Sequence, residues 1–287
     1  MSTRRNLWPL VLVVLAGAWL YSGVVAGLVH DWIHDENYSH GFLIVPLAAY
    51  FVWERRARLR SVRPRPTALG LVLVLASLAM LVAGVLGAEF FLARVSLIGV
   101  IAGTVLFLAG WEWLRVVAFP IAFLILMVPI PAIVFNQIAF PLQLFASRFG
   151  VSAMRLCSVP VLREGNVIIL ANTTLEVAEA CSGIRSLVSL LTLGLVYGYF
   201  ADSRLWVRVV IAASTVPIAI VANGLRVAGT GVLAHYLGPD VAQGFFHTFS
   251  GWLVFLAAFG LVAALVHSVH RFIPEPAPLL ARGETSA

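Results

Sequence analysis

The stretch Leu175–Leu187, LEVAEACSGIRSL, gathers side chains that could perform nucleophilic chemistry. Glu176, Glu179, Cys181 and Arg185 place two carboxylates, a thiol and a guanidinium within ten residues, at the start of an apolar run. Polar groups beside a membrane span are costly and mark functional sites. Because a thiolate is a strong nucleophile, Cys181 is the candidate reaction centre.

The composition is that of a polytopic membrane protein. Of 287 residues, 61% are hydrophobic and 11% are charged, whereas a soluble domain carries about 25% charge. All 19 basic residues are arginine, which excludes a Schiff-base lysine and the lysine of a phosphate-binding loop. Most arginines fall in short loops between apolar runs, where they set membrane topology, so we expect no nucleic-acid partner.

Apolar runs and arginine positions predict about eight spans, with both termini inside. The expected spans lie at 7–29, 42–53, 69–86, 95–110, 116–135, 186–200, 209–225 and 248–266. The loop ERRARLRSVRPRP holds six arginines, and the positive-inside rule assigns it to the cytoplasm. With this topology, 13 arginines lie inside and 6 lie outside or at the outer interface. The first run has no clear small-residue cleavage site, so we expect it to be retained as a span.

Three features from the outer end of the fifth span to the start of the sixth are unlike a simple span. Pro129 and Pro131 in MVPIP should break the helix, so that neighbouring groups must satisfy the freed carbonyls. Asn136–Leu156 is amphipathic, which places it at the outer interface or packed inside the bundle. Residues 158–180 are rich in valine, isoleucine and threonine, and predict a hairpin that turns at 163–166.

These features predict an all-α fold, a polytopic transmembrane helical bundle with a small extracytoplasmic hairpin. Residues 1–272 form the integral-membrane domain, and the proline-rich residues 273–287 form a disordered cytoplasmic tail.

The predicted topology brings three distant residues to one depth on the outer side. Cys181 lies at the outer end of the sixth span, Arg226 at that of the seventh, and His247 at that of the eighth. A thiolate can attack a carbonyl, an imidazole can exchange the proton, and a guanidinium can stabilise the oxyanion or hold a carboxylate. On chemistry alone, His235 and His40 compete with His247 for the role of the base.

Each of these residues also has a simpler interpretation. A lone membrane cysteine is usually a small buried hydrophobe, and Arg226 could be an interfacial anchor. The polar neighbours of Cys181 and of Arg226 favour a functional site instead: Glu179, Ser182, Gly183, Arg185 and Asn223. Glu176 and Glu179 could orient an imidazole, or pair with Arg185 or Arg163.

The two cysteines cannot form a disulfide framework, and no CxxC metal pattern occurs. Cys157 has no polar motif around it, which favours an inert thiol. A single disulfide between Cys157 and Cys181 remains open, because both lie on the expected oxidising side.

Several motifs together resemble the exosortase family. They are EVAEACSGIRSL, PIAIVANGLRV, FFHTFSGW, DENYSHGFLIVPL, and FLILMVPIPAIVFNQIAFPLQ with VLREGNVI, in order from about Asp35 to Trp252. The resemblance implies a cysteine transpeptidase of the bacterial inner membrane, related to archaeosortases and convergent with sortases. Its expected substrates are exported proteins with a C-terminal PEP-CTERM signal, which consists of a Pro-Glu-Pro motif, a transmembrane helix and a basic tail.

The resemblance also assigns roles to residues. It implies that Cys181, Arg226 and His247 are catalytic, and so favours His247 over His235. It also implies supporting or substrate-binding roles for Glu179, Ser182, Gly183, Arg185, Asn223 and, in the YSHG motif, His40. The expected active site faces the periplasm, needs no metal or organic cofactor, and passes its product to an unidentified acceptor nucleophile or to water.

Two other classes of protein fit the composition. A transporter of an anionic substrate could use Arg185 and Arg226 in its binding site, although it would not explain the thiol beside them. A non-catalytic assembly factor for polysaccharide export could have a similar composition.

Overall fold

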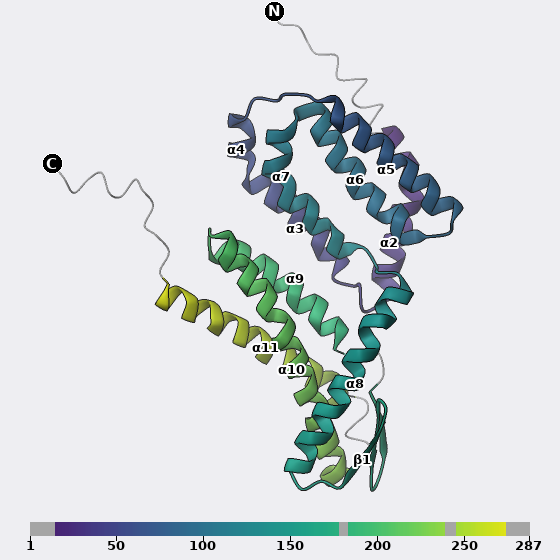
Figure 1. The fold of residues 1–287 in the computed structure, drawn as a ribbon, viewed down its shortest axis with the longest axis vertical. Helices are drawn as coiled ribbons and strands as arrows, with labels where there is room; N and C mark the ends of the chain where they lie inside the picture. The colour runs from purple at the N-terminus through teal and green to yellow at the C-terminus, as the bar shows by residue number, and fades with distance from the viewer. Residues whose placement is uncertain (1–14, 178–182, 239–244, 274–287) are drawn as a thin grey trace, which may run out of the picture. The chain divides into compact units, whose positions relative to one another are not determined.

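The computed structural model describes residues 15–177, 183–238 and 245–273 (Figure 1). Helices make up most of this part, and the fold is an all-α polytopic membrane bundle with one small sheet. The chain divides into two compact units, Met1–Val134 and Phe135–Ala287, and each is described by itself.

The first unit is built from helices that pack through small residues. They are α2 (Ser22–His34), α3 (Gly41–Glu54), α4 (Arg56–Ser61), α5 (Ala68–Leu86), α6 (Phe90–Ala109), α7 (Trp111–Phe123) and the 3-10 helix η1 (Leu124–Met127). In α5, Gly70 lies against the backbone of Phe107 in α6, and in α6, Gly103 lies against Val74. Glycine at these positions lets the two helices approach closely, as is common in membrane bundles.

Within the described residues the number of spans is smaller than the predicted eight. Five helices are long and apolar enough to cross a membrane, or six if 111–127 and 132–156 count as one broken span. The helix expected to span at 42–53 is α3, whose 14 residues are about 21 Å long, short of a hydrocarbon core of about 30 Å. The first expected span, 7–29, begins outside the described residues. The predicted class is confirmed, and the predicted count is wrong for this part of the chain.

The second unit combines long helices with a three-stranded sheet. Its elements are α8 (Ala132–Leu156, which begins at the end of the first unit), β1 (Val161–Glu164), β2 (Val167–Leu170), β3 (Thr174–Glu176), α9 (Ile184–Ala201), α10 (Leu205–Leu237) and α11 (Phe245–Phe272). β1 and β2 pair antiparallel around a turn at Gly165, whose φ is 64°. The predicted hairpin is therefore confirmed, and β3 adds a strand that the sequence did not predict.

The amphipathic segment forms α8, and its buried side packs against the sheet and α10. The buried positions of α8 recur every three or four residues: Ala139, Gln143, Ala146, Ser147, Gly150, Val151 and Met154. Ser147 Oγ donates a hydrogen bond to the carbonyl oxygen of Gly165 at 3.0 Å. One side of α8 is thus packed, whereas Ile133, Phe140 and Phe145 on this helix remain exposed.

Helix α10 is much longer than the span predicted at 209–225. It has 33 residues, which gives about 50 Å of helix. Its last turns pack on the sheet: Ala234 is fully buried in one cluster with Ile168 and Met154, and Asn172 Nδ2 donates to the carbonyl of Ala234 at 2.9 Å. The helix therefore continues beyond residue 225 and includes His235. Gly231 lies against Met154, so this glycine allows close packing within the helix instead of ending it.

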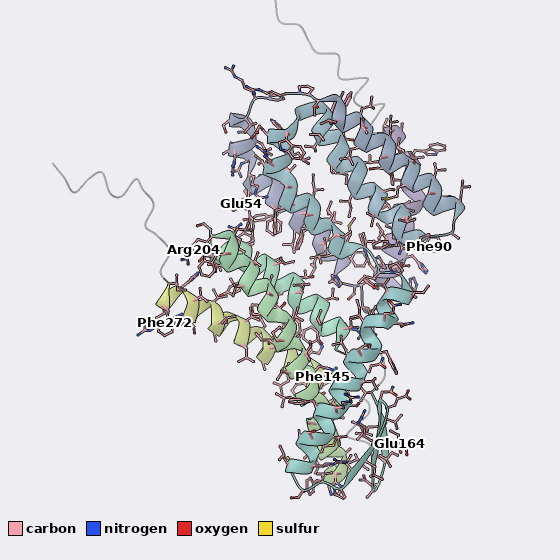
Figure 2. All side chains as sticks on the ribbon, viewed as in Figure 1. Glu54, Phe90, Phe145, Glu164, Arg204 and Phe272 are labelled. Atoms are coloured by element: carbon pink, nitrogen blue, oxygen red, sulfur yellow. The ribbon has the colours of Figure 1, made fainter. Side chains whose placement is uncertain are left out.

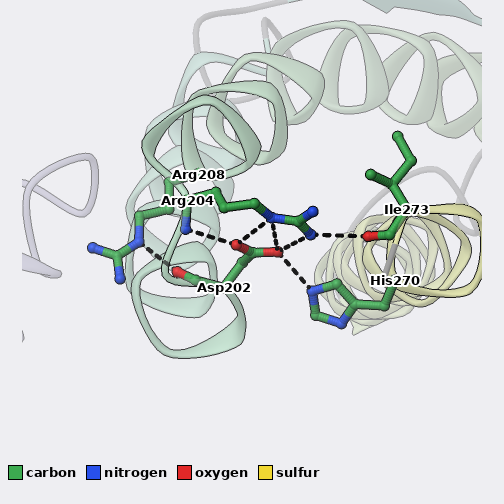
Figure 3. A network of polar contacts seen from close by, with 5 residues as sticks. All are labelled: Asp202, Arg204, Arg208, His270 and Ile273. Atoms are coloured by element: carbon green, nitrogen blue, oxygen red, sulfur yellow. Dashed lines mark hydrogen bonds and ion pairs between the residues drawn. The ribbon is translucent and has the colours of Figure 1, made fainter. Parts of the chain in front are cut away.

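A buried carboxylate connects the α9–α10 turn to the end of α11 (Figure 3). Asp202, whose side chain is fully buried, accepts hydrogen bonds from Arg204 at 2.6 and 3.0 Å and lies 3.1 Å from His270 Nε2. Arg204 also donates to the carbonyl of Ile273 at 3.0 Å. The hydrogen bond from Arg204 lowers the pKa of Asp202 to about 2.

The network lies close to the predicted start of the tail at 273. Helix α11 continues past the expected span, which ends at 266, to Phe272, so His267, His270 and Arg271 belong to the helix. Residues 274–287 of the predicted tail lie outside the described residues.

Candidate active site

Helix α9 begins at a glycine that no other residue could replace without strain. Gly183 is the N-cap of α9 and has a φ of 81°, in the left-handed region that favours glycine. A Cβ at this position would lie 2.7 Å from the side-chain Cγ of Asn223 in α10. The start of α9 and the middle of α10 are therefore in direct contact.

Asn223 lies at the centre of this contact and is 4% exposed. Two small cavities adjoin it. One is lined by Gly183, Leu187 and, from α8, Phe145, which Figure 2 labels. The other is lined by Ser186 of α9 and by Arg226, among others. A buried amide between two cavities can donate and accept hydrogen bonds with a bound group.

Arg226 lies on the same face of α10, three residues after Asn223. The half-buried guanidinium lies against α11, where a Cβ at Gly251 would be 3.3 Å from Arg226 Nη2. Glycine at 251 thus leaves room for the arginine. Gly251 was not predicted as a site residue, although the motif FFHTFSGW contains it.

The backbone of α11 shows where His247 lies along the helix relative to Gly251, the neighbour of Arg226. His247 is the third residue of α11, four residues before Gly251. Four residues correspond to one helical turn on the same face and to a rise of about 6 Å. The side chain of His247 is not among those that the structure describes.

The competing histidine, His235, is placed differently. It follows Arg226 by nine residues in the same helix, which corresponds to about 14 Å along the axis and to the opposite face. The ring of His235 packs edge-on against Tyr236, with centroids 4.8 Å apart. His235 therefore points away from the face that carries Arg226.

The proposed nucleophile itself lies outside the described residues, as do Glu179 and Ser182. Cys181 precedes Gly183 by two residues, so covalent geometry keeps its Cα within about 7 Å of that of Gly183. Arg185 is half-buried in the first turn of α9.

Cys157 is exposed just after the end of α8. The disulfide that the sequence left open would join it to Cys181, which is not among the described residues. Among the residues that are described, no group of three or more His, Cys, Asp and Glu could hold a metal ion.

His40 and its neighbours in the first unit contact the break in the helix at MVPIP. In a continuous α-helix the carbonyl of Met127 would accept from residue 131, but Pro131 has no N–H. The indole Nε1 of Trp32 donates to this carbonyl instead, at 2.9 Å. The residue before the break thus keeps a hydrogen-bond partner.

Two further backbone groups at this break also have side-chain hydrogen-bond partners. The amide of Ile130 donates to Tyr38 Oη at 3.1 Å, and His40 Nε2 lies 3.0 Å from the carbonyl of Leu126. Because a carbonyl only accepts, Nε2 must carry the hydrogen. Burial lowers the pKa of His40 and favours the neutral ring. We call Trp32, Tyr38 and His40 the backbone clamp; it gives the YSHG motif a structural role.

The fold and the site together define a polytopic membrane protein with a polar site where α9, α10 and α11 pack side by side (Figure 1). A scan against protein-family models matches the transmembrane exosortase family (Exosortase_EpsH) over residues 32–264. The match covers most of the chain, so the chain belongs to this family, as the motifs predicted. Searches of curated proteins and of solved structures gave no match.

Proposed function

We propose that this protein is a membrane-embedded cysteine peptidase and transpeptidase of the bacterial inner membrane. It cleaves C-terminal PEP-CTERM-type sorting signals of exported proteins at the periplasmic face and transfers the product to an acceptor nucleophile. One observation carries the proposal. Arg226 lines one cavity with Ser186 in the first turn of α9, which follows Cys181, and with Gly251 of α11, one turn after His247.

In this mechanism the Cys181 thiolate attacks the carbonyl carbon of the scissile peptide bond. Arg226 stabilises the oxyanion that forms. The C–N bond then breaks, His247 protonates the leaving amine, and a thioester on Cys181 remains. An acceptor amine, hydroxyl or water attacks the thioester, gives its proton to His247, and releases the thiolate.

An apolar groove between α10 and α11 supports a substrate with a transmembrane helix. The groove has a volume of about 350 Å³, and Pro217, Val221, Leu225 and Leu261 are among its lining residues. It shares Ala222, Val254 and Ala258 with the cavity that contains Arg226. A substrate helix in the groove would bring the residues preceding it to the depth of Arg226.

Blocking the groove tests this part of the proposal. Ala257 lines the groove and is exposed, so Ala257→Trp fills it without disturbing buried packing. We expect a higher KM for a tagged substrate and little change in kcat. Leu253→Trp, exposed on the same helix outside the groove lining, is the control and should keep the wild-type KM. Equal KM values for both variants would exclude this binding mode.

The cysteine mechanism is tested by Cys181→Ala in cells that make a tagged PEP-CTERM substrate. Processing should stop, while Cys157→Ala should process normally. Continued processing by a correctly inserted Cys181→Ala variant would exclude the mechanism. A mass spectrum of the new C-terminus then distinguishes transfer to an acceptor, which adds mass, from hydrolysis.

A further inference from the structure

The arginine segment, residues 55–65, has a fixed structure. It carries six arginines and connects α3 to α5 through the short helix α4. Arginines that only set topology need no particular conformation, because the positive-inside rule depends on their number and position in the chain. A folded arginine segment therefore calls for an additional explanation.

Two contacts fix the first half of this segment. Leu59 of α4 is 9% exposed and packs in a cluster with Val116, Val117 and Ile121 of α7. The guanidinium Nη1 of Arg55 donates to the carbonyl of Val116 at 3.1 Å. Helix α4 is thereby held against α7.

Two further hydrogen bonds fix the second half. The indole Nε1 of Trp113 donates to the carbonyl of Val62 at 3.1 Å, and the amide of Arg65 donates to the carbonyl of Ala109 at 2.9 Å. The carbonyl of Arg65 also lies against Gly110, where any Cβ would clash with it. The positions of the arginine backbones are thus set by α6 and α7.

The other five arginines of the segment present their side chains to the surroundings. All five are exposed: Arg56, Arg58, Arg60, Arg63 and Arg65. Within the part of the chain that the structure describes, none of them pairs with a carboxylate. Arg56 stacks on Trp53, with Cζ 3.9 Å from the ring centroid. Glu112 of α7 is paired with Arg115 at 2.9 Å.

The arginine segment lies at the depth of a membrane interface. It ends just before α5 begins at Ala68, and it is bonded to the last residue of α6, Ala109; both helices are candidate spans. Trp53 and Trp111 beside it are 56% and 53% exposed. Exposed tryptophans at span ends mark the headgroup region of a bilayer, where the phosphates of the lipids lie.

We propose that residues 55–65 form a binding surface for the phosphate groups of anionic phospholipid headgroups. Guanidinium groups bind phosphate with two parallel hydrogen bonds, and arginine is more weakly hydrated than lysine. Because the surrounding helices hold the arginine backbones in place, less conformational entropy is lost when a headgroup binds. The surface would anchor the first unit to anionic lipids of one leaflet.

The test compares lysine variants of the full-length protein in nanodiscs of phosphatidylcholine with and without phosphatidylglycerol. Arg58, Arg60 and Arg63 are replaced together by lysine, which keeps the charge that sets topology and removes the guanidinium fork. Native mass spectrometry counts the retained phosphatidylglycerol. We expect selective retention by the wild type, and roughly tenfold weaker retention by the lysine variant.

The matched control replaces three other exposed arginines, Arg115, Arg148 and Arg271, by lysine, and should retain phosphatidylglycerol like the wild type. Wild-type retention by the Arg58, Arg60 and Arg63 variant would overturn the proposal, because charge alone would then explain the binding. A comparison of Tm shifts tests whether the ligand is a lipid. Millimolar inorganic phosphate is added to the protein in nanodiscs of phosphatidylcholine alone. If it raises the Tm as much as phosphatidylglycerol in the nanodisc does, the ligand is a free anion and the proposal is wrong.

Discussion

Two regions of this protein hold polar side chains among apolar helices, and they use them differently. In the first unit, the backbone clamp directs Trp32, Tyr38 and His40 to backbone groups at the helix break. In the second unit, Asn223 and Arg226 adjoin small cavities, and glycines 183 and 251 make room for them. The difference indicates that the clamp stabilises the fold, whereas the second region can receive a reacting group.

Arg226→Gln should have the largest effect on activity. Loss of a group that stabilises an oxyanion costs about 10²–10³ in kcat. We expect processing of a tagged substrate to fall by that factor, with the Tm little changed. Arg148→Gln, exposed on α8, is the control. If Arg226→Gln processes normally, the second region is not the active site.

Gly183→Ala should lower both stability and activity. The new Cβ would meet Asn223 at 2.7 Å, and the φ of 81° disfavours alanine; the strain alone is worth about 1–3 kcal/mol. Gly165→Ala is a matched control, because Gly165 has a φ of 64° and nothing lies within 4 Å of an added Cβ. A similar loss of activity in both variants would show that the contact with Asn223 is unimportant.

Tyr38→Phe should lower stability and leave chemistry unchanged. It removes the hydroxyl that accepts from the amide of Ile130, and a buried unpaired donor costs about 1–3 kcal/mol. Thermal unfolding measures the loss, and Tyr236→Phe, exposed on α10, is the control. If Tyr38→Phe abolishes processing at wild-type stability, the backbone clamp has a role in the reaction. The distinction between a stabilising first region and a reactive second region would then be wrong.

The smallest expected effect concerns pH. The pKa of Asp202 is lowered from 3.8 to about 2, so its contribution to stability is complete above about pH 4 and is lost as the pH falls through about 2. Asp202→Asn should therefore lower the Tm at pH 7, and its difference from the wild type should shrink between pH 4 and pH 2. A constant difference over this range would show that the Asp202 carboxylate is not responsible.

Much of the fold could be predicted from local patterns. The break at MVPIP follows from the missing N–H groups of two prolines, and the hairpin follows from its β-branched residues and Gly165. The length of α10 could not be predicted in this way. Its last turns are stabilised by Met154, Ile168 and Asn172, which are distant in sequence. Glycines in such a segment indicate a helix end as readily as a close contact.

The candidate site, like the fold, could be predicted from the sequence only in part. The motifs name Cys181, Arg226 and His247, and the family match supports the resemblance on which those roles rest. Their catalytic roles stay a prediction. The sequence did not predict Gly251 as the neighbour of Arg226, because a glycine contact depends on how two helices pack.

By itself, the sequence determined that this is an all-α membrane protein with a cysteine motif at the start of an apolar helix, because composition and helix breakers act locally. Only the tertiary structure decided which backbone groups the YSHG motif satisfies, and that Asn223 and Arg226 lie between the start of α9 and Gly251. Those contacts join residues far apart in the chain, and packing between helices determines them.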